Sequence, residues 1–186
     1  MTAEHEPTAP AAPESPEPDA GGAYARPVEI IAILSVLAID QLSKLVVRHT
    51  LDLHDSVNLI PGVLDLTHVR NTGAAFGLLN AADFPYKPAV MIAIAAIALV
   101  AIAAYGAQLG LHERLARLGL SLILGGAFGN LIDRAVAGYV VDFVDVYWGN
   151  SHFWAFNMAD AAISTGAVLV LLDMIGLGRQ HVSHPL

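Results

Sequence analysis

Long apolar runs dominate this chain, and shorter polar segments separate them. Four of the runs reach or approach the roughly 20 apolar residues that a helix needs to cross the hydrocarbon core of a membrane. We therefore predict spanning helices over residues 28–47, 89–109, 115–132 and 156–177. This pattern is typical of an all-α membrane protein with four transmembrane helices, whose two termini would lie on the same side because the number of crossings is even.

Two connections between these runs have a different pattern. Residues 48–88 and 138–152 contain short runs of β-branched residues interrupted by Gly and Pro, and VVDFVDVYW at 140–148 favours a short strand. Backbone of this kind cannot face lipid, because unpaired N–H and C=O groups are costly in hydrocarbon. We expect both connections to lie outside the bilayer or to pack against protein.

The composition supports a membrane protein and changes the picture only at the ends of the chain. Hydrophobic residues make up 55% of the sequence, charged residues only 14%, and the mean hydropathy is +0.58. Residues 1–25 are rich in Pro, Ala and Glu, which predicts a disordered tail. We predict a membrane domain over residues 26–178 and a short C-terminal tail over residues 179–186. The basic loop residues divide evenly between the two sides, so they predict no orientation.

The first apolar run carries an acid and a base. Asp40 and Lys44 are four residues apart, so they can pair along one face of a helix. A charge at the centre of a spanning helix costs about 2.5–3.5 kcal/mol on insertion scales. Mutual neutralisation and a role in a functional site both remain open for this pair.

The third run ends with hydrogen-bonding residues at helical spacing. Gly126, Asn130, Asp133 and Arg134 are separated by 4, 3 and 1 residues, which places them near one face of a helix. The glycines of this run allow spanning helices to approach closely. The three polar side chains together indicate a polar interior.

A further acid lies at the start of the fourth run, where Asn157 and Asp160 share one helix face. The strand predicted before it carries Asp142 and Asp145. Their odd separation sends the two carboxylates to opposite sides of a strand, so only one of them can face Asp160.

Aspartic proteolysis requires at least two carboxyl groups close together, and here two converge at the edge of a membrane. Like charges push their proton affinities apart, so one acid keeps a proton while the other can deprotonate a water molecule. The chain has no cysteine, no HExxH zinc motif and no GxSxG motif, so the sequence predicts neither thiol, serine nor zinc peptidase chemistry. A small ion-coupled or proton-coupled transporter is the alternative from another class, and a structural scaffold is the third.

Five motifs, in order along the chain, resemble those of the lipoprotein signal peptidases, also called type II signal peptidases. They are DQLSK at 40–44, NTGAAF at 71–76, GGAFGNLIDR at 125–134, VVDF at 140–143 and FNMAD at 156–160. The resemblance implies a four-helix bundle in the bacterial inner membrane, both termini cytoplasmic, and a small extracytoplasmic β-cradle made from residues 48–88.

The resemblance also implies a function for named residues. Asp142 and Asp160 would be the catalytic pair. Asn71, Gly73, Asn130, Arg134 and Asn157 would line the substrate site, and Asp40, Lys44 and Asp133 would support the fold or the site. The family substrate is a prolipoprotein that carries diacylglycerol on a cysteine and is cut just before that cysteine. The antibiotic globomycin inhibits the family, and no metal or cofactor is expected.

Overall fold

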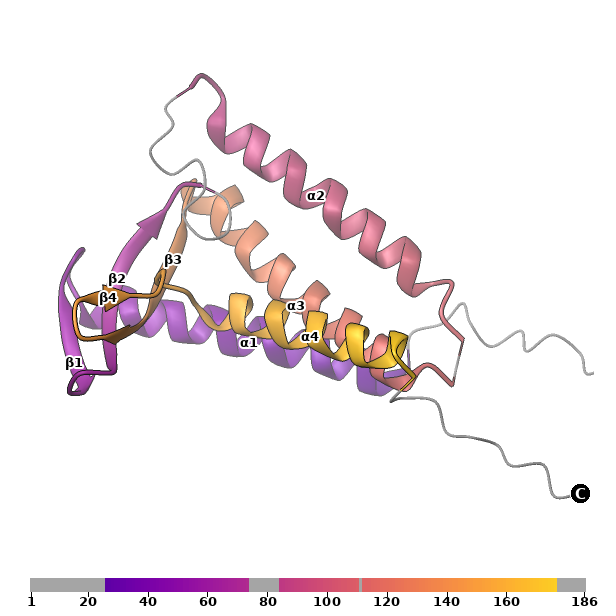
Figure 1. Cartoon of the computed structure of the whole chain (residues 1–186). Coiled ribbons are helices and arrows are strands. Elements are labelled where there is room, and N and C mark those ends of the chain that lie inside the picture. The colour runs from indigo at the N-terminus through magenta and orange to yellow at the C-terminus, as the bar shows by residue number, and fades with distance from the viewer. Residues whose placement is uncertain (1–25, 74–83, 111, 177–186) are drawn as a thin grey trace, which may run out of the picture.

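The computed structural model describes residues 26–73, 84–110 and 112–176. The two tails predicted at 1–25 and 179–186 therefore lie outside the described residues, as do positions 74–83 of the predicted cradle region. Within the described part, the chain forms four α-helices and a small antiparallel sheet at one end of them (Figure 1). The beginning of α1 and the end of α4 lie at the opposite end.

All four apolar runs form helices, as predicted, with shifted bounds. The helices are α1 (Pro27–Thr50), α2 (Lys87–Gly106), α3 (Arg114–Ala137) and α4 (Met158–Met174). Among the described residues, α1, α2 and α3 are long and apolar enough to cross a membrane, whereas α4 has 17 residues. α4 begins later than predicted because Asn157 caps it, and α3 continues to Ala137, where Gly138 ends the helix in a left-handed conformation.

The sheet contains the strands β1 (Ser56–Ile60), β2 (Leu64–Asn71), β3 (Val140–Trp148) and β4 (Ser151–His152), in the order β1-β2-β3-β4. The strand predicted over 140–148 is confirmed. The predicted cradle region 48–88 contributes β1 and β2, and the second connection adds β3 and β4 to the same run of strands. β3 pairs with β2 across the sheet, which brings a strand from late in the chain beside one from its first half.

α3 is the central helix and packs against α1, α2 and α4. Small residues allow these close approaches, as the sequence predicts. A Cβ on Gly125 would lie 2.9 Å from the carbonyl oxygen of Ile33 in α1, and a Cβ on Gly126 would collide with the carbonyl oxygen of Ala159 in α4. The backbones of neighbouring helices are therefore in direct contact beside the polar interior.

In the helices, many apolar side chains are exposed and several charged side chains are buried, which is the reverse of the distribution in a water-soluble protein. Large apolar side chains on α1 and α2, such as Ile31, Leu42 and Ile97, are exposed, whereas Asp40 and Lys44 are fully buried. An apolar exterior around a polar interior is the arrangement expected of helices surrounded by lipid. Several of the buried polar groups, Asp40, Lys44 and Asp133 among them, lie toward the sheet end of the helices, where the functional residues gather.

Candidate active site

A cavity of about 260 Å³ lies where the helices meet the sheet. Its walls come from β2, α2, α3, β3, α4 and the segment between β4 and α4, so residues from distant parts of the chain converge on it. The lining residues are Asn71, Ala95, Ala98, Ala127, Asn130, Arg134, Val140, Asp142, Phe153, Trp154, Ala155, Phe156, Asp160 and Ile163. Two carboxylates and one guanidinium thus face a space that is otherwise mostly apolar.

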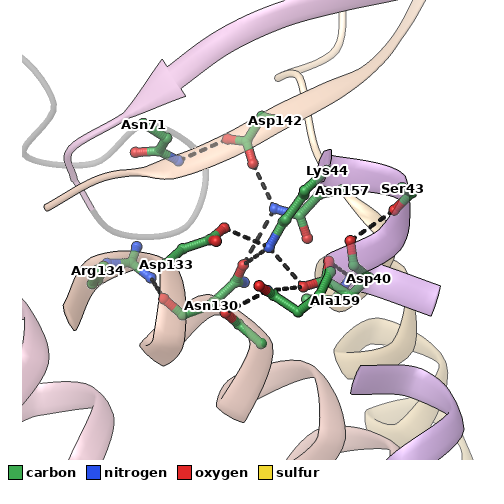
Figure 2. A network of polar contacts seen from close by, with 12 residues as sticks. Asp40, Ser43, Lys44, Asn71, Asn130, Asp133, Arg134, Asp142, Asn157 and Ala159 are labelled. Carbon is green, nitrogen blue, oxygen red and sulfur yellow. Dashed lines mark hydrogen bonds and ion pairs between the residues drawn. The ribbon is translucent and has the colours of Figure 1, made fainter. Parts of the chain in front are cut away.

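Asp142 reaches this cavity from β3, and amide groups hold both of its oxygens. Nδ2 of Asn71 donates to Oδ2 at 3.0 Å, and Nδ2 of Asn157 donates to Oδ1 at 2.6 Å (Figure 2). Asp145, on the same strand, does not line the cavity, and its Oδ2 lies 2.9 Å from Nδ1 of His152. The prediction that only one acid of this strand can face Asp160 is therefore confirmed.

Asp160 lies in the first turn of α4, where it forms a capping box with Asn157. Oδ1 of Asn157 accepts the N–H of Asp160 at 3.0 Å, and Oδ2 of Asp160 accepts the N–H of Asn157 at 3.3 Å. The other carboxylate oxygen, Oδ1, accepts a hydrogen bond from Nδ2 of Asn130 at 2.9 Å. Asn157 therefore connects the two acids, since its side-chain Nδ2 donates to the Asp142 carboxylate and its backbone N–H donates to the Asp160 carboxylate.

The environment of Asp142 makes its carboxyl group difficult to ionise. Its side chain is only 3% exposed, and burial, followed by the charge of Asp160, raises the pKa of Asp142 to about 6. The hydrogen bonds from Asn71 and Asn157 act in the opposite direction, since they stabilise the carboxylate. The two acids interact closely enough that their protons are best treated as belonging to the pair.

Arg134 projects from α3 into the cavity and fixes the chain that follows β2. Its Nη2 donates to the carbonyl oxygen of Gly73 at 2.7 Å, and its Nη1 donates to the carbonyl oxygen of Asn130 at 3.3 Å. The N–H of Gly73 donates to Oδ1 of Asn71 at 2.9 Å. Gly73 itself is buried and does not line the cavity, so it contributes by holding Asn71 and Arg134 in place.

Lys44 lies behind the cavity at the centre of a buried ionic cluster. Its Nζ is 2.8 Å from Oδ2 of Asp40, 2.9 Å from Oδ2 of Asp133 and 2.9 Å from Oδ1 of Asn130. Nη2 of Arg48 approaches Oδ1 of Asp133 at 2.8 Å. The pairing of Asp40 with Lys44 is therefore present, and the same ammonium group also positions the amide that holds the carboxylate of α4.

This cluster corrects one detail of the pattern predicted for α3. Asn130 and Arg134 line the cavity, but Asp133 does not; its side chain is directed toward Lys44 (Figure 2). Consecutive helical positions differ by about 100° around the axis, so Asp133 and Arg134 cannot both face the same space. Asp133 thus compensates a buried charge rather than presenting one to the cavity.

Asp40 has a second contact that anchors α4. Its Oδ1 accepts the backbone N–H of Ala159 at 2.9 Å, across 119 residues of sequence. A Cβ on Gly129 would collide with the Asp40 carboxylate, so only glycine leaves room for this contact on α3. The first turn of α4, and with it Asp160, is therefore positioned by a side chain from α1.

Several lining residues could not be predicted from the sequence. Ala95 and Ala98 lie in a helix without charges, and small apolar residues at that spacing are typical of any spanning helix. Phe153 and Phe156 flank the start of α4, and aromatic residues there are equally expected at a membrane boundary. Arg48 at the end of α1 was also missed; its only sequence signal was a position four residues beyond Lys44.

Comparisons with known proteins show similar sequences over most of this chain. Residues 32–176 match the family described as signal peptidase (SPase) II. The lipoprotein signal peptidase of Geobacter metallireducens is 48% identical over 139 residues, covering 75% of this chain and 85% of that protein. That of Geobacter sulfurreducens is 44% identical over 143 residues, covering 77% and 88%.

A solved structure described as a bacterial membrane enzyme superposes with a TM-score of 0.73 at 28% identity, covering 88% of this chain and 97% of that one. A second, with the same description, gives a TM-score of 0.71 at 29% identity, covering 83% and 96%. Sequence and fold thus agree over most of the chain. The chain belongs to the lipoprotein signal peptidase, or signal peptidase II, family.

Proposed function

We propose that this lipoprotein signal peptidase is an aspartic endopeptidase that works within the membrane. It removes the signal peptide from diacylglyceryl-modified prolipoproteins and cuts just before the lipidated cysteine. The observation that carries the proposal is that Asp142 and Asp160, from β3 and α4, face one cavity, and that Asn157 donates a hydrogen bond to each of their carboxylates.

In the proposed reaction the two acids hold one proton between them. In this scheme Asp142 keeps the proton, and Asp160 takes a proton from a water molecule that attacks the scissile carbonyl carbon. Asp142 donates its proton to the carbonyl oxygen as the tetrahedral intermediate forms. When the C–N bond breaks, Asp160 gives its proton to the leaving amine and Asp142 recovers its own, so the pair returns to its starting state.

The surrounding residues divide into two roles in this proposal. Asn71 and Arg134 line the cavity and would bind the substrate backbone there in addition to their present contacts, and Gly73 holds both of them in position. Asn130 and Asn157 act mainly by orienting the carboxylates; Asn157 is fully buried, so its contribution passes through the acids that it contacts. Asp40, Lys44 and Asp133 fix Asn130 and the first turn of α4.

We further propose that all four helices cross the bacterial inner membrane as one domain over residues 26–178. Both termini would then be cytoplasmic, and the sheet and the active site would lie near the extracytoplasmic face. The alternating directions of the helices place the start of α1 and the end of α4 at one end of the bundle and the sheet at the other (Figure 1), and the family resemblance supplies the assignment of sides. α4 is short for a span, and its first turn lies at the level of the polar site.

The composition of the cavity wall supports a substrate that arrives within the bilayer. Ala95 and Ala98 of α2, Ala127 of α3 and Ile163 of α4 all line it. Small side chains leave space between the helices, and apolar ones favour acyl chains over water. A diacylglyceryl group could therefore enter from the side while the peptide reaches the two acids.

A cleavage assay tests the proposal. Purified protein in lipid is incubated with a diacylglyceryl-modified prolipoprotein, and the size of the product is followed on gels for wild type, Asp142→Asn, Asp160→Asn and Asp145→Asn. Wild type and Asp145→Asn should cut, both dyad variants should not, and globomycin should block the reaction. Normal cleavage by both dyad variants would refute the aspartic mechanism, and an ion-flux assay would then test the transporter alternative.

A further inference from the structure

A second cavity, of about 320 Å³, lies between the starts of α1 and α3. Both helices begin at the end of the bundle that is away from the sheet, so this cavity is remote from the two acids (Figure 1). Its lining residues are Arg26, Val28, Glu29, Arg114, Arg117 and Leu118. Three arginines and one glutamate therefore surround a space that no step of the proposed reaction uses.

A buried ion pair forms one wall of this cavity. Nε and Nη2 of Arg117 lie 2.6 and 2.9 Å from the two carboxylate oxygens of Glu29, and Nη1 of Arg117 donates to the carbonyl oxygen of Leu109 at 2.9 Å. These contacts join α1, α3 and the α2–α3 connection to one another. Because this pair is neutral overall, it fixes the shape of the cavity without setting its charge.

The charged lining residues are three arginines against one glutamate, so the lining is positive overall. Arg114 is exposed and Arg26 is partly exposed. Glu113, next to Arg114 in sequence, has its Oε2 2.7 Å from the backbone N–H of Gly110 and does not line the cavity. Two guanidinium groups thus provide positive charge at the edge of the space, and planar guanidinium groups suit phosphate oxygens.

The other exposed surface of the cavity is apolar. Val28 is 58% exposed and Leu118 is 36% exposed, and Ile31, one helical turn further along α1, is 62% exposed. An apolar surface therefore runs from the cavity along helices that are long enough to cross a membrane. A soluble phosphate compound would gain nothing from this surface, whereas the acyl chains of a lipid would bury against it.

We propose that this cavity binds one anionic glycerophospholipid. Its phosphate lies between Arg26 and Arg114, and its acyl chains lie along the exposed apolar residues of α1 and α3. Basic pockets between membrane helices are a known means of binding acidic headgroups. The inference depends on α1 and α3 crossing the membrane, but it does not depend on the proposed peptidase chemistry.

Lipid binding to the full-length protein tests the proposal. The protein is purified in a neutral detergent, and native mass spectrometry measures the dissociation constants of phosphatidylglycerol and of phosphatidylcholine. Wild type should bind one phosphatidylglycerol in preference to phosphatidylcholine. Arg26→Gln and Arg114→Gln should each weaken that binding about 5-fold, and the double variant about 25-fold, at about 1 kcal/mol per arginine near a lipid headgroup.

Two controls separate the lipid site from general charge effects. Arg70→Gln removes one exposed arginine at the sheet end and should leave phosphatidylglycerol binding unchanged. Inorganic phosphate should not displace the lipid when the two are present at equal concentration.

Equal binding of the two lipids to wild type would overturn the proposal without any variant. The proposal would also be overturned if Arg70→Gln weakened phosphatidylglycerol binding as much as Arg114→Gln does. Displacement of the bound lipid by inorganic phosphate would overturn it too.

Discussion

Replacing Asp142 by Asn should stop cleavage and also stabilise the folded protein at neutral pH. The pKa of Asp142 rises from an ordinary 3.8 to about 6 on folding, mainly because the group is buried. The folded protein therefore binds this proton more tightly than the unfolded chain does. The stability that Asp142 contributes is fully present below its pKa in the unfolded chain. It is lost as the pH rises through its pKa in the folded protein.

The size of the effect follows from the two pKa values. At about 1.36 kcal/mol per pKa unit, the ionised Asp142 lowers the free energy of unfolding by about 3 kcal/mol at about pH 8, but by only about 0.5 kcal/mol at about pH 4. Asn cannot ionise, so it avoids this loss. It also places an NH₂ group opposite Asn71 or Asn157, which costs about 1 kcal/mol at every pH. The variant should be more stable by about 2 kcal/mol at about pH 8 and slightly less stable at about pH 4.

Thermal unfolding in detergent micelles at the two pH values measures this difference. For a chain of this length, about 2 kcal/mol corresponds to a rise of about 4–8 °C in the unfolding temperature. Asp145→Asn, on the same strand but outside the cavity, is the matched control and should retain cleavage. An Asp142→Asn effect of the same size at both pH values would refute the reasoning, because only the ionisation of Asp142 makes it depend on pH.

Two further substitutions test the packing around the site. Lys44→Met leaves Asp40 and Asp133 buried without their shared cation and should cost about 3–5 kcal/mol of stability, seen as a large fall in unfolding temperature; an unchanged temperature would show that the cluster is not buried as described. Gly126→Ala should push α4 away from α3 at Ala159, cost about 1–3 kcal/mol and reduce cleavage, measured on the same preparation; full activity at wild-type stability would contradict the close helix contact.

Much of the fold follows from local sequence patterns. The length of the apolar runs predicts four helices, since a helix in lipid must satisfy its own backbone groups over the full thickness of the hydrocarbon. The two-residue repeat of a strand predicts that Asp142 and Asp145 face opposite sides, and the glycines of α3 predict close contact with its neighbours. Helix bounds were less accurate, because the cap at Asn157 depends on the side chain of Asp160.

The sequence also limited which residues could carry chemistry. Without cysteine and without the zinc or serine motifs, acids inside the membrane segment were the remaining candidates, and the five ordered motifs indicated which ones. The sequence could not decide whether the Asp40–Lys44 pair merely neutralises itself. Lys44 contacts Asn130 of α3, 86 residues away in sequence, and Asp40 contacts Ala159 of α4, 119 residues away. No local pattern could therefore reveal these two functions of the pair.

Only the tertiary structure decided how the polar groups are shared among helices. It directs Asp133 toward Lys44 and Arg134 into the cavity, makes Asn157 the link between two acids, and adds β3 and β4 to the sheet. Local periodicity fixes the face of an element on which a side chain lies, because it depends only on neighbouring residues. Which element that face meets depends on the packing of the whole bundle, where close contact of α3 with α1 and α4 leaves each buried charge a single set of partners.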